Sequence, residues 1–313
     1  MFAYNASQIK TTYMKYVITG SVGHISKPIV EALVKAGQEV SVISSSAERR
    51  AEIEALGARP LIGNVEDINF LKEAFRGADA VYTMVPPKMA TSEWKKHIAS
   101  VGANYAEAIK STGVKYVVNL SSVGAHLPEG CGPVSGLHRG ENALNELSGV
   151  NVLHLRPGFF FINFYPLTEM IKHAGIAGGN YGGEVPIILS DTNDIAEVAA
   201  DALLNLKFSG KSVKYLSSDE RTTDQIASTL GSAIGKPELP WIIFSDEENL
   251  DGLVKAGLTR ELADNYTEMG AAMRTGIMFT DYHQTGQKPN GRTKLEDFAK
   301  QFSYAFQQPE SVS

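Results

Sequence analysis

The sequence predicts an α/β protein whose main part is a doubly wound parallel sheet, followed by a smaller and mostly helical part. Short runs rich in β-branched residues alternate with longer helical stretches between Lys15 and Gly158. A turn with two glycines joins the first run to the first helix. After Gly158 the alternation gives way to an aromatic run, a glycine-rich loop and, from about residue 218, mainly helical patterns. Alternating strands and helices are typical of a parallel sheet covered by helices on both faces.

Each element is predicted from its hydrophobic period and its flanking turn residues. The runs expected to enter the main sheet are KYVIT, EVSVIS, RPLIG, DAVYTMV, VKYVVNLS, VNVLHLRPG and SVKYLS. The helices expected to accompany them cover residues 25–36, 47–56, 67–75, 92–111, 137–147 and 193–205. A further strand, IILS, is expected just before the last of these helices.

The helix over residues 92–111 has the clearest pattern. Apolar residues recur at helical spacing, so they are expected to face the core: Trp94, Ile98, Val101, Tyr105 and Ile109. Thr91 or Ser92 can cap its first turn, and Gly113 can end it.

We expect two domains and a short extension. Residues 14–158 together with about 187–217 form the larger domain, and residues 159–186 together with about 218–313 form the smaller one. The smaller domain is discontinuous because the chain leaves the sheet after Gly158 and later returns. Residues 1–13 are polar and aperiodic, so we expect an N-terminal extension, with Met14 as an alternative start.

The composition excludes several classes of protein. The 313 residues are 43% hydrophobic and 20% charged, which is ordinary for a globular chain. A net charge of -6 argues against direct nucleic-acid binding. No signal peptide and no apolar stretch of roughly 18 residues is present, so we expect a cytoplasmic protein without a membrane span. The single cysteine, Cys131, excludes an internal disulfide and is expected to be a free surface thiol.

The stretch ITGSVGHISKPIV resembles a dinucleotide-binding turn with one part exchanged. Gly20 permits the tight turn, and Gly23 lets the backbone approach a pyrophosphate at the N-terminus of the next helix. Ser26 stands at the third glycine position, where a small side chain suffices, and Pro28 fits the first helical turn. The context of strand, turn and helix therefore predicts a Rossmann-type NAD(P)-binding domain.

The end of the second strand favours NADP(H) over NAD(H). A carboxylate at this point would bind the adenosine ribose of NAD(H), but the sequence reads SSSAERR and its first carboxylate is Glu48. The hydroxyls of Ser44, Ser45 and Ser46 and the positive charge of Arg49 would suit a 2′-phosphate. Alternatively, Arg49 and Arg50 simply lie on the solvated face of the following helix.

Four segments together resemble the NmrA-like group of atypical short-chain dehydrogenases/reductases. The segments are VITGSVGHISKPIVEAL, ALGARPLIGNVEDINFLKEAFRGADAVYTMVPP, VKYVVNLSSVGAH and SGVNVLHLRPGFFFINF. They span roughly residues 15–205. The family includes NADPH-dependent quinone and enone-type reductases, and also regulators that bind a dinucleotide without turning it over.

The resemblance implies a set of cofactor contacts. Those expected along the pyrophosphate are Gly20, Ser21, Gly23, His24 and Ile25. Ser44 and its neighbours would contact the adenosine ribose, and Asn64 with Val65 the adenine. Asn64 departs from the aspartate that is common in the family. The residues expected on the nicotinamide side are Thr83, Met84, Val85 and Pro86.

A classical short-chain dehydrogenase uses tyrosine with lysine four residues later, because the lysine lowers the pKa of the phenol. None of the twelve tyrosines has lysine at that offset. His138 lies near the tyrosine position and could donate a proton, or it is an ordinary histidine of a first turn. Ser121 and Ser122 follow the fifth strand, where they could orient a carbonyl or merely end the strand. No histidine or acidic pattern predicts a metal site.

The aromatic run after Gly158 is a candidate substrate wall. The residues proposed for it are Phe159, Phe160, Phe161, Asn163 and Tyr165, although aromatic runs are also common in cores. The glycine-rich loop at 174–186 could fold over a substrate or be a passive connection.

Two main functions remain open. The first is NADPH-dependent reduction of quinones or similarly conjugated, electron-poor small molecules, which needs orientation over the nicotinamide more than proton transfer. The second is a non-catalytic dinucleotide sensor that acts through a protein partner. Epimerisation of a nucleotide-linked sugar is a weaker alternative, since the tyrosine–lysine pair is missing. The oligomeric state is left open.

Overall fold

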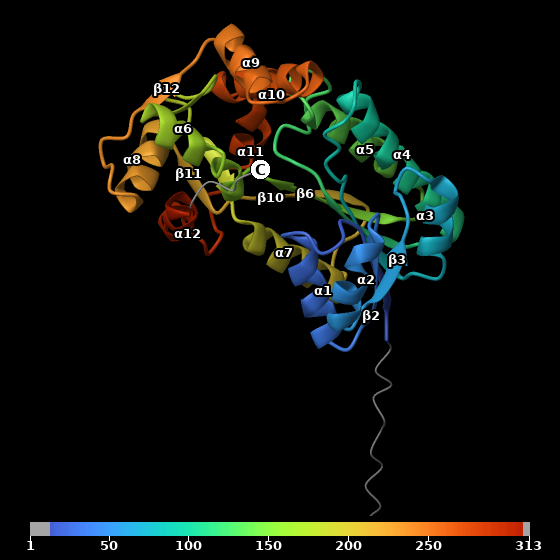
Figure 1. Cartoon of the computed structure of the whole chain (residues 1–313). Helices are drawn as coiled ribbons and strands as arrows, with labels where there is room; N and C mark the ends of the chain where they lie inside the picture. The colour runs from blue at the N-terminus through green and yellow to red at the C-terminus, as the bar shows by residue number, and fades with distance from the viewer. Residues whose placement is uncertain (1–12, 309–313) are drawn as a thin grey trace, which may run out of the picture.

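The computed structural model describes residues 13–308 and has a parallel sheet of seven strands at its centre (Figure 1). In spatial order the strands are β10 (Lys211–Leu216), β6 (Asn151–Pro157), β5 (Tyr116–Leu120), β4 (Ala80–Thr83), β1 (Lys15–Ile18), β2 (Glu39–Ser44) and β3 (Arg59–Ile62). The order changes direction between β1 and β4, which is where an open α/β sheet binds its ligand. The predicted doubly wound Rossmann-type sheet is confirmed.

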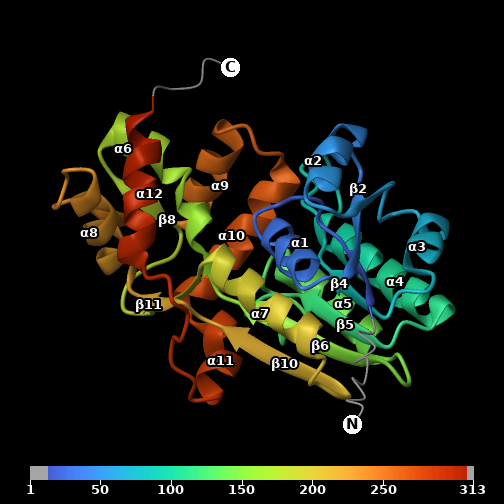
Figure 2. The same ribbon diagram turned by 90° about the horizontal axis from the view of Figure 1, so that it is seen from below.

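Helices cover both faces of this sheet (Figures 1 and 2). The flanking helices are α1 (Ser26–Lys35), α2 (Arg50–Ala55), α3 (Ile68–Phe75), α4 (Trp94–Thr112), α5 (Val134–Asn145) and α7 (Thr192–Asn205). Helices α1 and α7 pack together, and α4 packs between α3 and α5. At the crossing of α4 and α5 a Cβ on Gly102 would lie 2.6 Å from the Cα of Gly140, so the two backbones nearly touch.

Helix α4 confirms its predicted core face and corrects its predicted cap. All five predicted core residues of α4 are buried, and Gly113 ends the helix in the left-handed conformation. The prediction that Thr91 or Ser92 caps the helix is wrong. Its N-cap is Glu93, without a side-chain cap, and the backbone N–H of Trp94 donates instead to Glu261 Oε1 at 2.7 Å. A carboxylate from a distant helix therefore supplies the missing acceptor.

The remaining elements form a smaller and mostly helical part. Its helices are α6 (Leu167–Ala174), α8 (Thr223–Ala233), α9 (Asp246–Lys255), α10 (Arg260–Arg274), α11 (Thr280–Gln284) and α12 (Leu295–Gln307). Two small sheets join them, one of β7 (Phe159–Phe160), β9 (Ile187–Ser190) and β11 (Asp219–Arg221), the other of β8 (Ala177–Gly179) and β12 (Trp241–Ile243). The strand expected at IILS is β9, and it lies in a small sheet.

The glycine-rich loop is largely built into this part. Its residues 177–179 form β8, and a Cβ on Gly178 would lie 2.6 Å from the carbonyl oxygen of Ile242. This packing favours a fixed connection over a loop that closes on a substrate. The predicted extension at residues 1–13 lies outside the described residues except for Tyr13.

Cys131 is not on the surface, so that prediction is wrong. Its side chain is fully buried in the core beside Val134 and Met278, and burial raises the pKa of its thiol to about 12. Among the described helices, none has the length and apolar character required to cross a membrane.

Candidate functional site

The turn after β1 has the backbone geometry that the sequence predicts. Gly20 has φ +87°, and a Cβ there would lie 2.5 Å from Ser26 Oγ and 2.9 Å from the Met84 side chain. The next residue, Ser21, also has a positive φ of 55°. A Cβ on Gly23 would lie 3.2 Å from the carbonyl oxygen of Gly20. The turn is therefore too tight for a side chain at position 20, and it leaves little room for one at position 23.

Ser26 does more than replace a glycine. Its buried hydroxyl donates to the carbonyl oxygen of Thr19 at 2.8 Å, which ties the start of α1 to the end of β1. Helix α1 has no side-chain N-cap and no acidic residue in its first turn. Its N-terminal amides and its dipole are thus available to an anion. The residues present fit a dinucleotide diphosphate at this turn.

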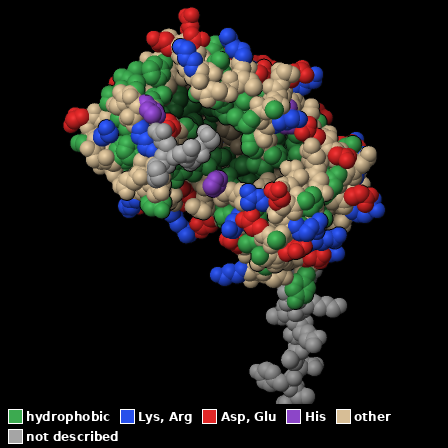
Figure 3. Space-filling model, viewed as in Figure 1, with side chains coloured by type: hydrophobic (Ala, Val, Ile, Leu, Met, Phe, Trp, Pro, Cys, Tyr) green, Lys and Arg blue, Asp and Glu red, His purple; other side chains and the backbone are tan. Residues whose placement is uncertain are grey.

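A cavity of about 550 Å³ opens at the turn. Eleven of the predicted cofactor residues line it: Gly20, Ser21, Gly23, His24, Ile25, Ser44, Ser45, Asn64, Val65, Met84 and Pro86. They come from the ends of four strands or the loops after them, β1 to β4, which meet at one edge of the sheet. The space-filling view shows a hollow with mainly hydrophobic walls between the C-terminal helices and those that flank the sheet (Figure 3).

The serines after β2 differ in position. Ser44 is buried, and Ser21 Oγ donates to its hydroxyl at 3.1 Å, which links the glycine turn to β2. Ser45 is exposed and lines the cavity. Ser46 instead caps the short helix Ala47–Arg49. Arg49 lies outside the cavity lining, where its guanidinium pairs with Glu52 at 2.7 Å.

The residues after β4 are held by hydrogen bonds from neighbouring elements. The backbone N–H of Met84 donates to Thr19 Oγ1 at 2.8 Å, and the Tyr105 hydroxyl donates to the Met84 carbonyl at 2.8 Å. Thr83 is buried and donates to Asn119 Oδ1 on β5, so it does not line the cavity. Val85 packs into the core beside Trp94. Of the four residues predicted for the nicotinamide side, Met84 and Pro86 reach the cavity.

Three charged or titratable residues of the cavity were not predicted. Lys88 donates to both carboxylate oxygens of Glu66, at 3.0 and 2.9 Å, and His97 Nδ1 lies 3.7 Å from the same carboxylate. The hydrogen bond from Lys88 lowers the pKa of Glu66. Burial lowers the pKa of His97. These residues come from three separate segments, so no local pattern joins them in the sequence.

The predicted catalytic residues lie outside this cavity. His138 Nδ1 lies 2.8 Å from the carbonyl oxygen of Ala125, so this nitrogen carries the proton. Its Nε2 then accepts from Asn142 Nδ2 at 2.9 Å. The backbone N–H of Ser121 donates to Leu155, while its buried Oγ has no hydrogen-bond partner among the described residues. Ser122 accepts from the backbone N–H of Ala125.

The aromatic run contributes less to the cavity than predicted. Phe160 lines it, together with Ile162. Phe159 packs against Phe164, and Tyr165 against Phe298, both at ring-centroid distances of 5.2 Å. Phe161 is fully buried, and Asn163 is exposed. Most of this run is therefore core packing. Ser26 of the predicted turn also lines the cavity. Further cavity residues that the sequence did not predict are Ile43, Gly63, Pro87, Leu120 and Thr192.

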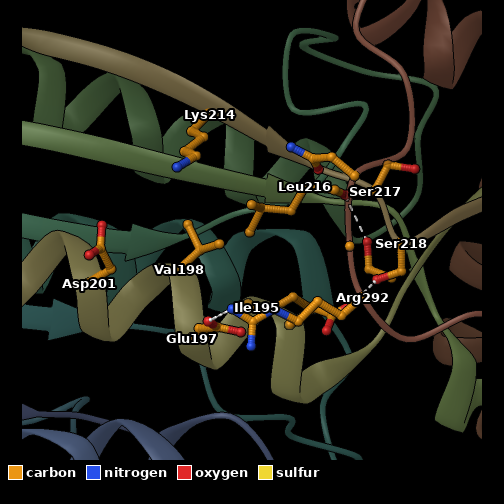
Figure 4. Close-up of a pocket in the computed structure, with 13 residues that line it drawn as sticks. Ile195, Glu197, Val198, Asp201, Lys214, Leu216, Ser217, Ser218 and Arg292 are labelled. Atoms are coloured by element: carbon orange, nitrogen blue, oxygen red, sulfur yellow. Dashed lines mark hydrogen bonds and ion pairs between the residues drawn. The ribbon is translucent and has the colours of Figure 1, made fainter.

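A second cavity of about 270 Å³ lies between α7 and β10 (Figure 4). It contains none of the predicted site residues. Two pairs of its side chains interact: Arg292 pairs with Glu197 at 2.7 Å, and the Ser218 hydroxyl donates to Asp194 at 2.6 Å. The glycine turn therefore points to the larger cavity as the functional one.

The family model described as NAD(P)H-binding matches residues 20–205. The chain belongs to this NAD(P)H-binding family. The match begins at Gly20, the first residue of the predicted turn, and spans every strand from β2 to β9. The predicted resemblance and the binding of NAD(P)H are thereby confirmed.

Relatives cover nearly the whole length of this NAD(P)H-binding protein. An NAD(P)H azoreductase of Xenophilus azovorans is 26% identical over 93% of this chain and 98% of its own. An NADPH-dependent quinone oxidoreductase of Escherichia coli, solved with NADPH, has a TM-score of 0.77 at 22% identity over 91% of this chain and 99% of its own. A Citrobacter triphenylmethane reductase, solved with NADP(H), has a TM-score of 0.76 at 21% identity over 92% and 100%. The two solved structures show the shared fold. With the family match, these findings confirm the predicted NAD(P)H-dependent oxidoreductase.

Proposed function

We propose that this oxidoreductase uses NADPH to reduce quinones or similarly conjugated, electron-poor small molecules. One observation carries the proposal: a single cavity has the glycine turn and helix α1 at one part of its wall and apolar side chains at another, namely Leu120, Phe160 and Ile162. A flat, apolar acceptor suits such a wall. Relatives named as azoreductase and quinone oxidoreductase support the same substrate class.

The chemistry required of the chain is modest. NADPH, when bound, supplies a hydride to the acceptor. The chain's own residues hold the diphosphate at the amides before α1, keep the Met84 peptide in place through Thr19 and Tyr105, and exclude water with apolar side chains. A quinone is already electrophilic and solvent can deliver its protons, so orientation supplies most of the catalysis. This agrees with a chain whose tyrosines all lack the partner lysine.

The preference for NADPH is proposed from the loop after β2. Its first carboxylate, Glu48, lies within the short helix Ala47–Arg49, so no acidic side chain directly follows β2 to accept from a ribose 2′-hydroxyl. Ser45 lines the cavity there, and Arg49 has an exposed guanidinium that can exchange Glu52 for a phosphate.

Steady-state oxidation of NADPH and NADH with a panel of quinones, an azo dye and a triphenylmethane dye tests the proposal. We expect turnover with at least one quinone and a higher kcat/KM for NADPH. Arg49→Ala should reduce the preference for NADPH over NADH. Arg76→Ala removes a similar surface pair with Glu73 of α3 and should leave that preference unchanged. Tight NADPH binding without turnover of any acceptor would overturn the assignment.

A non-catalytic sensor is the second candidate. It is favoured by one observation, that His138, Ser121 and Ser122 all lie outside the cavity lining. A sensor is expected to bind the oxidised and the reduced cofactor with different affinities. It is also expected to bind its protein partner in only one of those two states. Equal affinities for the two states would exclude it.

A further inference from the structure

The charges that line the cofactor cavity cancel one another. Of the described residues that line it, Lys88 is the only lysine or arginine and Glu66 the only aspartate or glutamate. They form an ion pair in which the ammonium bonds both carboxylate oxygens. A dinucleotide carries at least two negative charges on its phosphates. Among the described residues, the one lysine or arginine that lines the cavity is therefore already paired with a carboxylate.

The backbone of Glu66 is anchored on the cavity wall by two hydrogen bonds. The backbone N–H of Glu66 donates to Asn64 Oδ1 at 3.0 Å, and Asn104 of α4 donates to the Glu66 carbonyl at 3.0 Å. Lys88 lies in the segment between β4 and α4, directly after Pro86 and Pro87. Its side chain is longer than that of Glu66 and about equally exposed, 39% against 41%. When the pair opens, the ammonium is thus the partner that is free to move.

Burial of His97 keeps it from neutralising Glu66. His97 Nδ1 is 3.7 Å from the Glu66 carboxylate, but its pKa is lowered by burial, so the imidazole is neutral near pH 7. Lys88 remains the cation that faces this carboxylate. Loss of Lys88 to another anion would leave Glu66 charged beside that anion, which opposes binding.

We propose that Glu66 masks Lys88, and that a phosphate group of the dinucleotide takes Lys88 over from Glu66 on binding. The inference rests on the proposed function in so far as the cavity binds the cofactor. Under this exchange Lys88 contributes to affinity and Glu66 reduces it. The two halves of one ion pair then have opposite effects. A pair that only clamps the two loops together would instead give the same effect from either half.

The test is equilibrium binding of NADPH and of NADH, without any acceptor, followed by calorimetry. Glu66→Gln keeps a hydrogen-bond acceptor for Lys88 but removes the charge, so Kd should fall several-fold. Lys88→Met should raise Kd about tenfold or more, since a charge-assisted bond is lost. The double variant should resemble Lys88→Met. Lys72→Met and Glu107→Gln, which break a surface pair of 3.0 Å between α3 and α4, serve as controls and should bind as the wild type does.

Comparing NADPH with NADH shows which phosphate group of the dinucleotide binds Lys88. A loss confined to NADPH in Lys88→Met assigns Lys88 to the 2′-phosphate, and an equal loss with NADH assigns it to the diphosphate. Thermal unfolding of each variant confirms that it is folded. Weaker binding in both single variants, or unchanged binding in both, would overturn the exchange. A wild-type protein that binds neither dinucleotide would instead remove the proposed function itself.

Discussion

The hydroxyl of Ser26 and the carbonyl oxygen of Thr19 form a hydrogen bond of 2.8 Å that closes the turn between β1 and α1. Both groups are buried. The residue at the third glycine position thus stabilises the turn that a glycine would only permit.

Ser26→Ala should remove this bond and leave the Thr19 carbonyl without the hydroxyl. We expect the free energy of unfolding to fall by about 1 kcal/mol and the Kd for NADPH to rise a few-fold. Chemical denaturation and calorimetry measure the two. Ser100→Ala is the matched control, because the Ser100 hydroxyl makes a similar 2.8 Å bond to the Lys96 carbonyl on an exposed helix face. Equal effects of both substitutions would contradict the role of Ser26.

Gly20→Ala should be far more damaging than an alanine at another left-handed glycine. Gly37 has φ +75° with nothing within 4 Å of an added Cβ, whereas Gly20 has φ +87° and meets Ser26 and Met84. Gly37→Ala therefore reports the backbone cost alone, about 1–2 kcal/mol. Gly20→Ala adds crowding of the turn, so we expect greater loss of stability and loss of NADPH binding. Normal binding by Gly20→Ala would show that the turn does not hold the cofactor.

A buried ion pair joins α5 to β6. Arg156 Nε and Nη2 donate to the two carboxylate oxygens of Glu141, at 3.0 and 2.6 Å, and Arg156 also pairs with Asp281 of α11 at 2.8 Å. Arg156→Met should lower the free energy of unfolding by about 3–5 kcal/mol, because Glu141 is left charged and buried. Adding Glu141→Gln should restore part of the loss. Arg139, also on α5, forms an exposed pair with Glu129 of the loop before that helix, and Arg139→Met should cost less than about 1 kcal/mol.

His154 should make stability fall in mild acid. Thr83 donates to Asn119 Oδ1, Asn119 Nδ2 donates to His154 Nδ1 at 3.1 Å, and His154 Nε2–H donates to Asn145 at 3.0 Å. This series of hydrogen bonds requires a neutral His154 imidazole, and burial lowers the pKa of His154 below the ordinary 6.5. Below pH 6.5 the unfolded chain binds a proton that the folded chain does not, so stability is lost at up to about 1.4 kcal/mol per pH unit.

Denaturation at a series of pH values between 7.5 and 5 checks this dependence. His154→Gln removes its share, so the variant should lose stability less steeply than the wild type as the pH falls. Burial also lowers the pKa of His97 and His126, so a smaller dependence should remain. Identical slopes in wild type and variant would contradict the assignment.

The thiol of Cys131 should be unreactive in the folded protein. It is fully buried, and burial raises its pKa to about 12. A thiolate is the reactive species, so a disulfide reagent at pH 8 should label no thiol in the native state and one per chain after denaturation. Rapid native labelling would show that the Cys131 segment opens readily.

Local patterns were sufficient to predict the sheet and most of its helices. The face of α4 and its end at Gly113 follow from spacing and from one residue that adopts positive φ easily. The N-cap of α4 was predicted wrongly because the first backbone N–H of the helix, that of Trp94, donates to Glu261, which lies 167 residues away. Propensity at Thr91 and Ser92 cannot report a partner supplied by tertiary packing.

Some residues of the cavity could be predicted from the sequence and others could not. Gly20 and Gly23 were predicted because the strand end, the turn and the helix start are adjacent in sequence. Most of the other lining residues that were predicted, such as Asn64 and Met84, were implied by the family resemblance. Glu66, Lys88 and His97 were missed since their contact depends on how three segments meet at the sheet edge. The aromatic run was ambiguous because a buried ring and a ring facing a cavity have the same sequence signal, and only Phe160 reaches the cavity.

The last strand of the main sheet, β10, is synthesised long after its neighbour β6. Strand β6 ends at Pro157, but β10, which pairs along all its length, begins only at Lys211. Until then one side of β6 presents unpaired backbone groups on a strand with six of seven residues buried in the finished fold. Such an edge is a template for pairing with another chain. A nascent or truncated polypeptide that stops before β10 is therefore expected to aggregate rather than persist as a smaller folded unit.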